Sequence, residues 1–136
     1  MVDTVNSQTL QDGERLVIQK FTNTSDGTGE TNVVKVNVSA LAPNSFGVAC
    51  TGVKINKIWS STHGMEVRIS WEATTPIMAW VIPQNTTYHM CFGEHFGGLT
   101  NNAAATGNTG NITFTTSDQS AGDMYSIVLE CIKIYG

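Results

Sequence analysis

The clearest strand pattern in the chain is the segment Met65-Glu66-Val67-Arg68-Ile69-Ser70-Trp71-Glu72. Its apolar side chains occupy every second position, and a polar side chain stands between each of them. Because successive side chains of a β-strand point to opposite faces, this segment turns one face to a core and the other to solvent. The pair His63-Gly64 stands just before the segment and predicts a turn there.

Similar short apolar segments recur along the rest of the chain, and turn residues interrupt them about every 8–12 residues. They lack the i, i+3, i+4, i+7 spacing of an amphipathic helix. Strands are predicted at 14–22, 31–41, 65–72, 76–82, 86–92, 111–116 and 124–135, with two more between 47 and 60 that bend at Gly52. The pattern predicts an all-β fold, an antiparallel β-sandwich of the Greek-key or jelly-roll type with about eight or nine strands. A closed barrel is the alternative.

The strands at 14–22 and 31–41 are expected to form a hairpin. The loop between them, Ser25-Asp26-Gly27-Thr28-Gly29, contains two glycines, which can take the positive φ values of a tight reversal. On the return strand, Val34, Val36 and Val38 are expected to face the core. The alternating residues, beginning with Lys35, are expected to face solvent.

The first thirteen residues do not follow the strand pattern. Residues 1–13 are polar and carry isolated apolar side chains at Val2, Val5 and Leu10. The sequence therefore predicts a short N-terminal arm at 1–13 and one β-sandwich domain at 14–136. We expect the three apolar side chains of the arm to contact a partner protein, and a frayed terminus is the alternative.

The last predicted strand is apolar on both faces. One face carries Tyr125, Ile127, Leu129 and Cys131, and the other carries Val128, Ile132 and Ile134. A strand of this kind needs cover on both sides, and the core of one domain supplies only one of them. We therefore expect the second face, together with the loop at 97–110, to mediate self-association through Leu99, Val128, Ile132 and Ile134.

Composition excludes two classes of partner. The chain has 136 residues, of which 13% are charged, and its net charge is −4. The Lys and Arg residues are scattered, so no basic stripe is present to bind the phosphates of a nucleic acid. No apolar run approaches the roughly 20 residues of a membrane-spanning helix, and residues 1–13 do not resemble a signal peptide. We expect a cytosolic protein whose neutral polar surface loses few charges when it packs against other subunits.

The densest group of potential metal ligands is His89, Cys91, Glu94 and His95. Its spacing matches no common zinc signature, so we expect a packed strand end and a turn, with no metal and no other cofactor. A small metal-dependent enzyme would require His89, His95 and a carboxylate to converge in a pocket. The cysteines, Cys50, Cys91 and Cys131, are an odd number at wide spacings and are expected to be small apolar fillers.

The sequence indicates no catalytic residue. It contains no Gly-x-Ser-x-Gly turn for a nucleophilic serine, and no acidic partner is placed by sequence beside His63. Three tryptophans, Trp59, Trp71 and Trp80, offer a platform on which sugars stack in other proteins. Carbohydrate binding therefore stands as an alternative function.

The segment Phe21-Thr22-Asn23-Thr24-Ser25-Asp26-Gly27-Thr28-Gly29-Glu30, continuing through Val33-Val34-Lys35-Val36 to Leu41, resembles the opening of small virion proteins of tailed bacteriophages. The C-terminal half is similar to that family's order of loop, strand, turn and closing strand. The segments that carry this likeness are Phe96-Gly97-Gly98-Leu99, Gly110-Asn111-Ile112-Thr113-Phe114-Thr115-Thr116 and Gly122-Asp123-Met124-Tyr125-Ser126-Ile127-Val128-Leu129-Glu130.

The resemblance implies a β-sandwich of the capsid decoration or cement type, without catalytic residues. Such a protein would sit on the capsid surface of the virion, after assembly in the cytoplasm of the bacterial host. It would bridge neighbouring subunits of the major capsid protein. Symmetry favours a homodimer or homotrimer, because decoration sites lie on local symmetry axes. The alternative is a carbohydrate-binding module of a phage adsorption structure.

Overall fold

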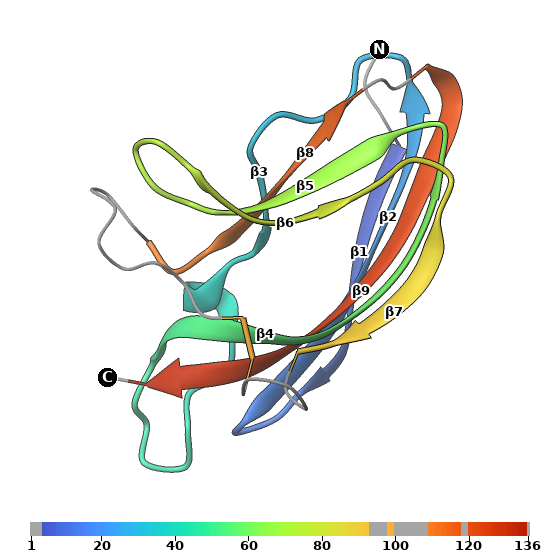
Figure 1. The fold of residues 1–136 in the computed structure, drawn as a ribbon. Coiled ribbons are helices and arrows are strands. Elements are labelled where there is room, and N and C mark those ends of the chain that lie inside the picture. The colour runs from blue at the N-terminus through green and yellow to red at the C-terminus, as the bar shows by residue number, and fades with distance from the viewer. Residues whose placement is uncertain (1–3, 93–97, 100–108, 118–119, 136) are drawn as a thin grey trace.

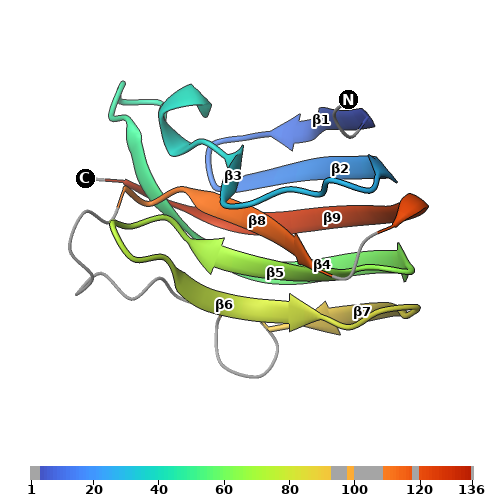
Figure 2. The same cartoon turned by 90° about the horizontal axis from the view of Figure 1, so that it is seen from above.

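A computed structural model describes residues 4–92, 98–99, 109–117 and 120–135, which form two β-sheets packed face to face (Figures 1 and 2). The strands of the described residues are β1 (Thr4–Asp12), β2 (Leu16–Asp26), β3 (Val33–Val36), β4 (Cys50–His63), β5 (Glu66–Trp71), β6 (Ile77–Ile82), β7 (Thr87–Cys91), β8 (Ile112–Ser117) and β9 (Ala121–Tyr135). A short 3-10 turn, η1 (Val38–Ala40), follows β3. No helix in this described part of the chain has the length and apolar character needed to cross a bilayer.

The two sheets have the topology of a jelly roll. One sheet has the strand order β1-β2-β9-β4-β7 and the other has the order β3-β8-β5-β6. All strand pairs are antiparallel, and from β2 onward every connection crosses to the other sheet except the one between β5 and β6. The predicted antiparallel sandwich is therefore confirmed, and the described strands form two open sheets in place of a closed barrel.

The core lies between the sheets and is built from the alternating residues. Met65, Val67, Ile69 and Trp71 are buried, as their spacing predicts. The face of β9 from Tyr125 to Cys131 is buried as well. Three aromatic rings link the sheets near one end. The Phe114 ring of β8 lies edge-on to Phe21 of β2 and to Tyr125 of β9, with centroid distances of 5.4 and 5.8 Å.

The predicted hairpin between 14–22 and 31–41 is wrong. Strand β2 pairs with β1 and β9, whereas β3 crosses to the other sheet and pairs with β8. The register of β3 shifts between Val34 and Val36, and this irregularity breaks the expected alternation. Val34 is 39% exposed, whereas Val36 is buried and the Lys35 side chain is only 4% exposed. The residue that we expected to face solvent therefore lies inside the sandwich.

The predicted N-terminal arm is also wrong for the described residues. Thr4–Asp12 is the edge strand β1, which pairs along its length with β2. The segment forms a strand through its backbone hydrogen bonds to β2. It has too few apolar side chains for its sequence alone to predict a strand. Within the described residues, the sandwich therefore already includes residues 4–12, ahead of the predicted start at residue 14.

The region around Gly52 forms one long strand in place of the two short strands that we expected. Strand β4 carries register shifts between Cys50 and Gly52 and between Ile55 and Lys57. The predicted irregularity at Gly52 is confirmed. A bulge adds one residue without ending the strand, so β4 bends and continues along β9 (Figure 1).

Replacement of the buried Phe114 ring should lower stability strongly. We expect Phe114→Ala to lower the free energy of unfolding by about 3 to 5 kcal/mol, because it leaves a cavity between the sheets. Phe46→Ala is the matched control, since that ring is 89% exposed, and should change stability by less than about 0.5 kcal/mol. Urea unfolding followed by circular dichroism measures both values, and equal losses would contradict this core.

Candidate functional site

Strand β1 lies at the outer edge of the five-stranded sheet, and β2 is its only partner among the described strands (Figure 2). All side chains from Val5 to Gln11 are exposed, because the facing sheet has one strand fewer and leaves β1 uncovered. Val5 and Leu10 are 48% and 50% exposed. Val2, the third apolar residue proposed for partner contact, lies outside the described residues. The exposed edge is therefore a candidate interaction surface, defined here as the β1 edge (Val5–Gln11).

The β1 edge has little protection against pairing with another strand. Natural edge strands usually carry charged residues or proline, which block the approach of a second strand. The residues from Thr4 to Gln11 include neither, and the only irregularity is a register shift between Thr9 and Gln11. An uncharged edge of this length has free backbone groups that a partner strand can pair with.

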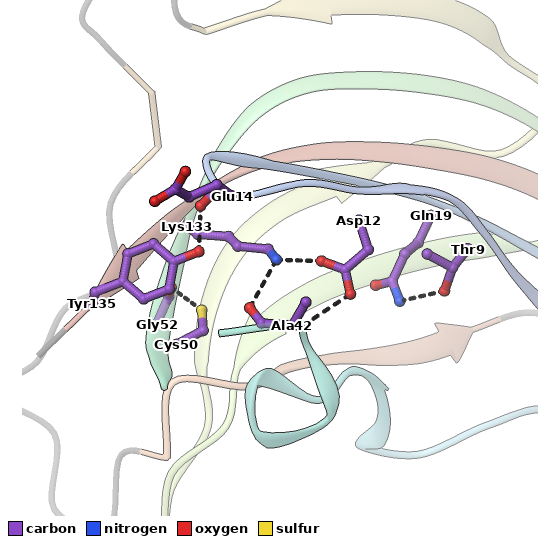
Figure 3. A network of polar contacts seen from close by, with 9 residues as sticks. All are labelled: Thr9, Asp12, Glu14, Gln19, Ala42, Cys50, Gly52, Lys133 and Tyr135. Atoms are coloured by element: carbon purple, nitrogen blue, oxygen red, sulfur yellow. Dashed lines mark hydrogen bonds and ion pairs between the residues drawn. The ribbon is translucent and has the colours of Figure 1, made fainter. Parts of the chain in front are cut away.

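The C-terminal end of β1 is fixed by a buried lysine (Figure 3). Lys133 projects inward from β9, its side chain is fully buried, and its ammonium group pairs with the Asp12 carboxylate. The Lys133 Nζ also donates to the carbonyl oxygen of Ala42 at 3.1 Å, and the Ala42 N–H donates to Asp12 at 3.0 Å. Asp12 therefore joins β1, β9 and the segment after η1.

Glu14 continues this network into the turn between β1 and β2 (Figure 3). Its carboxylate accepts hydrogen bonds from the Ser45 N–H at 3.1 Å and from the Ser45 hydroxyl at 2.8 Å. These two bonds hold the pKa of Glu14 below its usual value, the backbone bond contributing most. The Tyr135 hydroxyl donates to the backbone carbonyl of Glu14. The contact between the Glu14 carboxylate and Ser45 is fully present above the ordinary pKa of a glutamate and is lost as the pH falls through the lowered value.

The residues proposed for self-association lie in two different places. Val128 and Ile132 are half-buried and Ile134 is 40% exposed, and all three lie on the outer face of β9. Ile132 also lines a hollow of about 240 Å³ with Leu16. Leu99 does not join them, because it pairs through its backbone with Ile55 and packs against the core.

The proposed metal ligands are only partly described. His89 lies on the outer face of β7 and stacks on the Trp59 ring, with a centroid distance of 5.1 Å and an angle of 8° between the planes. Cys91 is half-buried on the same strand. Glu94 and His95 lie outside the described residues. Within the described part of the chain, no three His, Cys, Asp or Glu side chains are grouped to hold a metal ion.

The three tryptophans do not form one platform. Trp71 is buried in the core, and Trp80 packs edge-on against Phe92 with a centroid distance of 4.8 Å. Trp59 is half-buried on the outer face of the five-stranded sheet, against His89. A sugar that stacked on Trp59 could not contact Trp71, because Trp71 is enclosed between the sheets.

A groove of about 700 Å³ lies on the outer face of the four-stranded sheet. Its lining mixes polar side chains, including Arg68 and Asn32, with the apolar side chains of Met78 and Val81. Asn32 has a φ of 49°, and its N–H donates to the Thr115 hydroxyl oxygen at 2.9 Å. The groove therefore combines hydrogen-bonding groups with apolar contact area.

A polar cluster inside the sandwich was not identified from the sequence. The Glu30 carboxylate is buried, with one oxygen 2.6 Å from the Lys35 ammonium nitrogen. Its other oxygen accepts hydrogen bonds from the Tyr125 hydroxyl at 2.6 Å and from the Asn23 side-chain amide at 2.9 Å. We define Asn23, Glu30, Lys35 and Tyr125 as the Glu30 cluster.

The loop between β2 and β3 directs Glu30 into the core. Gly27 and Gly29 have φ values of 106° and 77°, a region that favours glycine, and they reverse the chain just before Glu30. The Glu30 N–H donates to the Thr116 hydroxyl at 2.8 Å, and the Thr116 N–H donates to the Glu30 carbonyl at 3.0 Å. Two features of the sequence could have indicated the Glu30 cluster. One is the lysine among the valines of β3, and the other is the glutamate directly after a glycine turn.

Loss of Asp12 should be far more harmful than loss of a surface carboxylate. We expect Asp12→Asn to lower the free energy of unfolding by about 3 kcal/mol, because it leaves the Lys133 charge buried without its carboxylate. Glu66→Gln is the control. Its carboxylate lies 3.5 Å from Arg68, whose side chain is 51% exposed, and such pairs contribute less than about 1 kcal/mol. Urea unfolding measures both variants, and a smaller loss for Asp12→Asn would contradict the network.

The cysteines should differ in reactivity. Burial raises the pKa of the Cys131 thiol to about 12, so at pH 8 almost none of it is the reactive thiolate. We expect iodoacetamide to modify half-buried Cys91 at least about 100-fold faster than Cys131 in the native protein, and to modify both at similar rates in urea. Peptide mass spectrometry after timed quenching measures the rates. Fast native labelling of Cys131 would contradict its position in the core.

Comparison with known proteins gives a likeness at the level of structure. No protein-family model and no curated protein sequence matches the chain. Among solved structures, the chain is similar to a cupin superfamily protein from Desulfitobacterium hafniense, at 12% sequence identity and a TM-score of 0.32. The match covers 95% of this chain and 80% of that chain. The assignment of an antiparallel jelly-roll sandwich follows from the strand order of this chain.

Proposed function

We propose that this chain is a non-enzymatic structural protein of a phage virion, of the capsid decoration or cement type. In this function it bridges subunits of the major capsid protein on the outside of the head and stabilises the shell. The observation that carries the proposal is the β1 edge, an uncharged strand that is exposed on both faces and has no neighbour on one side among the described residues. Such a surface suits docking to another protein by strand addition.

A bridging protein needs a second contact surface, and the outer face of β9 supplies a candidate. Val128, Ile132 and Ile134 lie there, away from the β1 edge. Contact between copies through these residues would give the dimer or trimer that a symmetry axis on a capsid requires. Two contacts on one rigid body also raise the effective concentration of the second after the first has formed.

Fold and composition give general support. Jelly rolls occur in viral capsid proteins, although they also occur in lectins and cupins, so this is support by analogy. The low share of charged residues, 13% of the chain, reduces the cost of removing water from a contact surface. The sequence resemblance to small virion proteins covers most of residues 14–135 and favours the virion among these classes.

The proposal predicts that the chain is present in purified virions and binds to heads that lack it. Heads from a phage with the gene deleted should bind the purified chain in sedimentation and then withstand a higher temperature. The double variant Val5→Lys and Ser7→Lys should bind at least about 10-fold more weakly, because it adds charge to the β1 edge. Phe46→Lys is the control, since it adds charge at another exposed site.

Two results would overturn this function. One is the absence of the chain from virions by mass spectrometry. The other is a chain that remains monomeric by light scattering at micromolar concentration and also fails to bind the deleted heads. Equal binding by the Val5→Lys and Ser7→Lys variant would instead remove the β1 edge as the contact surface.

The second candidate function is carbohydrate binding in a phage adsorption structure. The groove on the four-stranded sheet favours it, because Arg68, Asn32 and Thr115 offer hydrogen-bonding groups beside the apolar side chains of Met78 and Val81. Binding to a glycan array that is lost in Arg68→Ala and kept in Trp59→Ala would support a sugar site in this groove. Loss in Trp59→Ala alone would place it on the five-stranded sheet.

A further inference from the structure

We propose that Lys35 and Asn23 become joined by an intramolecular isopeptide bond between Lys35 Nζ and Asn23 Cγ, with Glu30 as the catalytic residue. The bond would link β3 of one sheet to β2 of the other across the core. It is a modification of the chain itself, and it is independent of the function proposed above.

The Glu30 cluster holds the reacting groups on one carboxylate. Lys35 Nζ lies 2.6 Å from one Glu30 oxygen, and the Asn23 amide nitrogen lies 2.9 Å from the other. The amine of Lys35 and the side-chain amide of Asn23 therefore both contact the Glu30 carboxylate, one at each oxygen. The attacking group and the leaving group therefore share the same proton carrier.

Burial gives these groups the surroundings that the reaction requires. Asn23 is 1% exposed, and the side chains of Lys35 and Glu30 are 4% and 5% exposed. The Lys35 nitrogen lies 5.9 Å from the centre of the Phe114 ring, and the Tyr125 hydroxyl donates to the Glu30 oxygen that also binds Asn23. A site without bulk water leaves a lysine amine weakly solvated and protects the acyl group from hydrolysis.

The reaction balances without an oxidant or an added co-reactant. One proton passes from the Lys35 ammonium to Glu30, and the free amine attacks Asn23 Cγ to form a tetrahedral intermediate. A second proton leaves the attacking nitrogen while the Asn23 nitrogen gains one through Glu30, and the Cγ–Nδ2 bond breaks. The products are the new amide and one molecule of ammonia, and Glu30 keeps the first proton until it is lost to the departing ammonia or to water.

Comparison with the second buried lysine, Lys133, shows which contacts are particular to the Glu30 cluster. Lys133 is also fully buried, but its partners are the Asp12 carboxylate and the carbonyl oxygen of Ala42. Asp12 accepts a further hydrogen bond from the backbone of Ala42. Among the described contacts of Lys133 and Asp12, no side-chain amide binds the carboxylate that pairs with the lysine. Lys133 therefore provides a matched control on the same fold.

The first test is the mass of the intact wild-type protein. The folded chain should be lighter than its sequence requires by about 17 Da, the mass of one ammonia. The Glu30→Gln and Lys35→Met variants should have the full masses of their sequences, whereas Lys133→Met should still show the loss. A wild-type chain at its full mass would overturn the proposal, whether or not any variant folds.

The second test locates the bond. Trypsin should fail to cut after Lys35 and should release residues 21–54 as one peptide that carries the mass loss. Cleavage of that peptide after Glu30 should leave the two halves covalently joined, with fragmentation placing the link between Asn23 and Lys35. Separation of the halves would overturn the proposal, because a cyclised asparagine loses the same mass without joining two segments.

The third measurement is thermal stability. Lys35→Met and Glu30→Gln should unfold at a temperature lower than wild type by about 10 °C or more, because they lose a covalent closure between the sheets. Mild heating of newly refolded wild-type protein should move its mass from the full value to the reduced value with time. A bond that forms equally fast in Glu30→Gln would overturn the catalytic function of Glu30.

Discussion

The sandwich depends on a carboxylate placed between its two sheets. Glu30 is buried where an unpaired charge would be very costly, so Lys35, Tyr125 and Asn23 must all be positioned around it. These partners come from β3, β9 and β2, so the requirement ties both sheets together at one end of the core. The reversed conformations of Gly27 and Gly29 follow from the same need, because they bring the chain back toward the core.

A second buried charge occupies the other end of β9. The inward face of this strand begins with Tyr125 at the Glu30 cluster and ends with Lys133 at Asp12, and the apolar core lies between them. Each charged group can be satisfied in only one arrangement of the strands. A slip of β9 by one residue would turn both polar side chains outward and leave Glu30 and Asp12 without these partners. The apolar residues of β9 alone would permit its register to vary. The contacts of Tyr125 with Glu30 and of Lys133 with Asp12 therefore define that register.

The unequal number of strands in the two sheets explains the surface of the molecule. The five-stranded sheet extends past the four-stranded sheet at β1, so no described strand of the second sheet covers it (Figure 2). Lys133 and Asp12 hold the C-terminal end of β1 on the domain, while its free edge faces outward. A strand that is fixed at one end and uncovered along its length is well suited to contact another protein. This arrangement connects the fold to the function in assembly that we propose.

Alternation of apolar and polar residues was enough to predict the antiparallel sandwich, the buried faces of β5 and β9, and the irregularity at Gly52. Those features depend on local spacing, which the order of residues states directly. The partners of β2 and β3, the strand at β1 and the burial of Lys35 were decided by tertiary structure. Each depends on backbone pairing and charge contacts between segments far apart in the chain, such as Glu30 with Tyr125 and Asp12 with Lys133. Local spacing carries no record of such distant contacts, and so the Glu30 cluster became visible only when the two sheets were brought together.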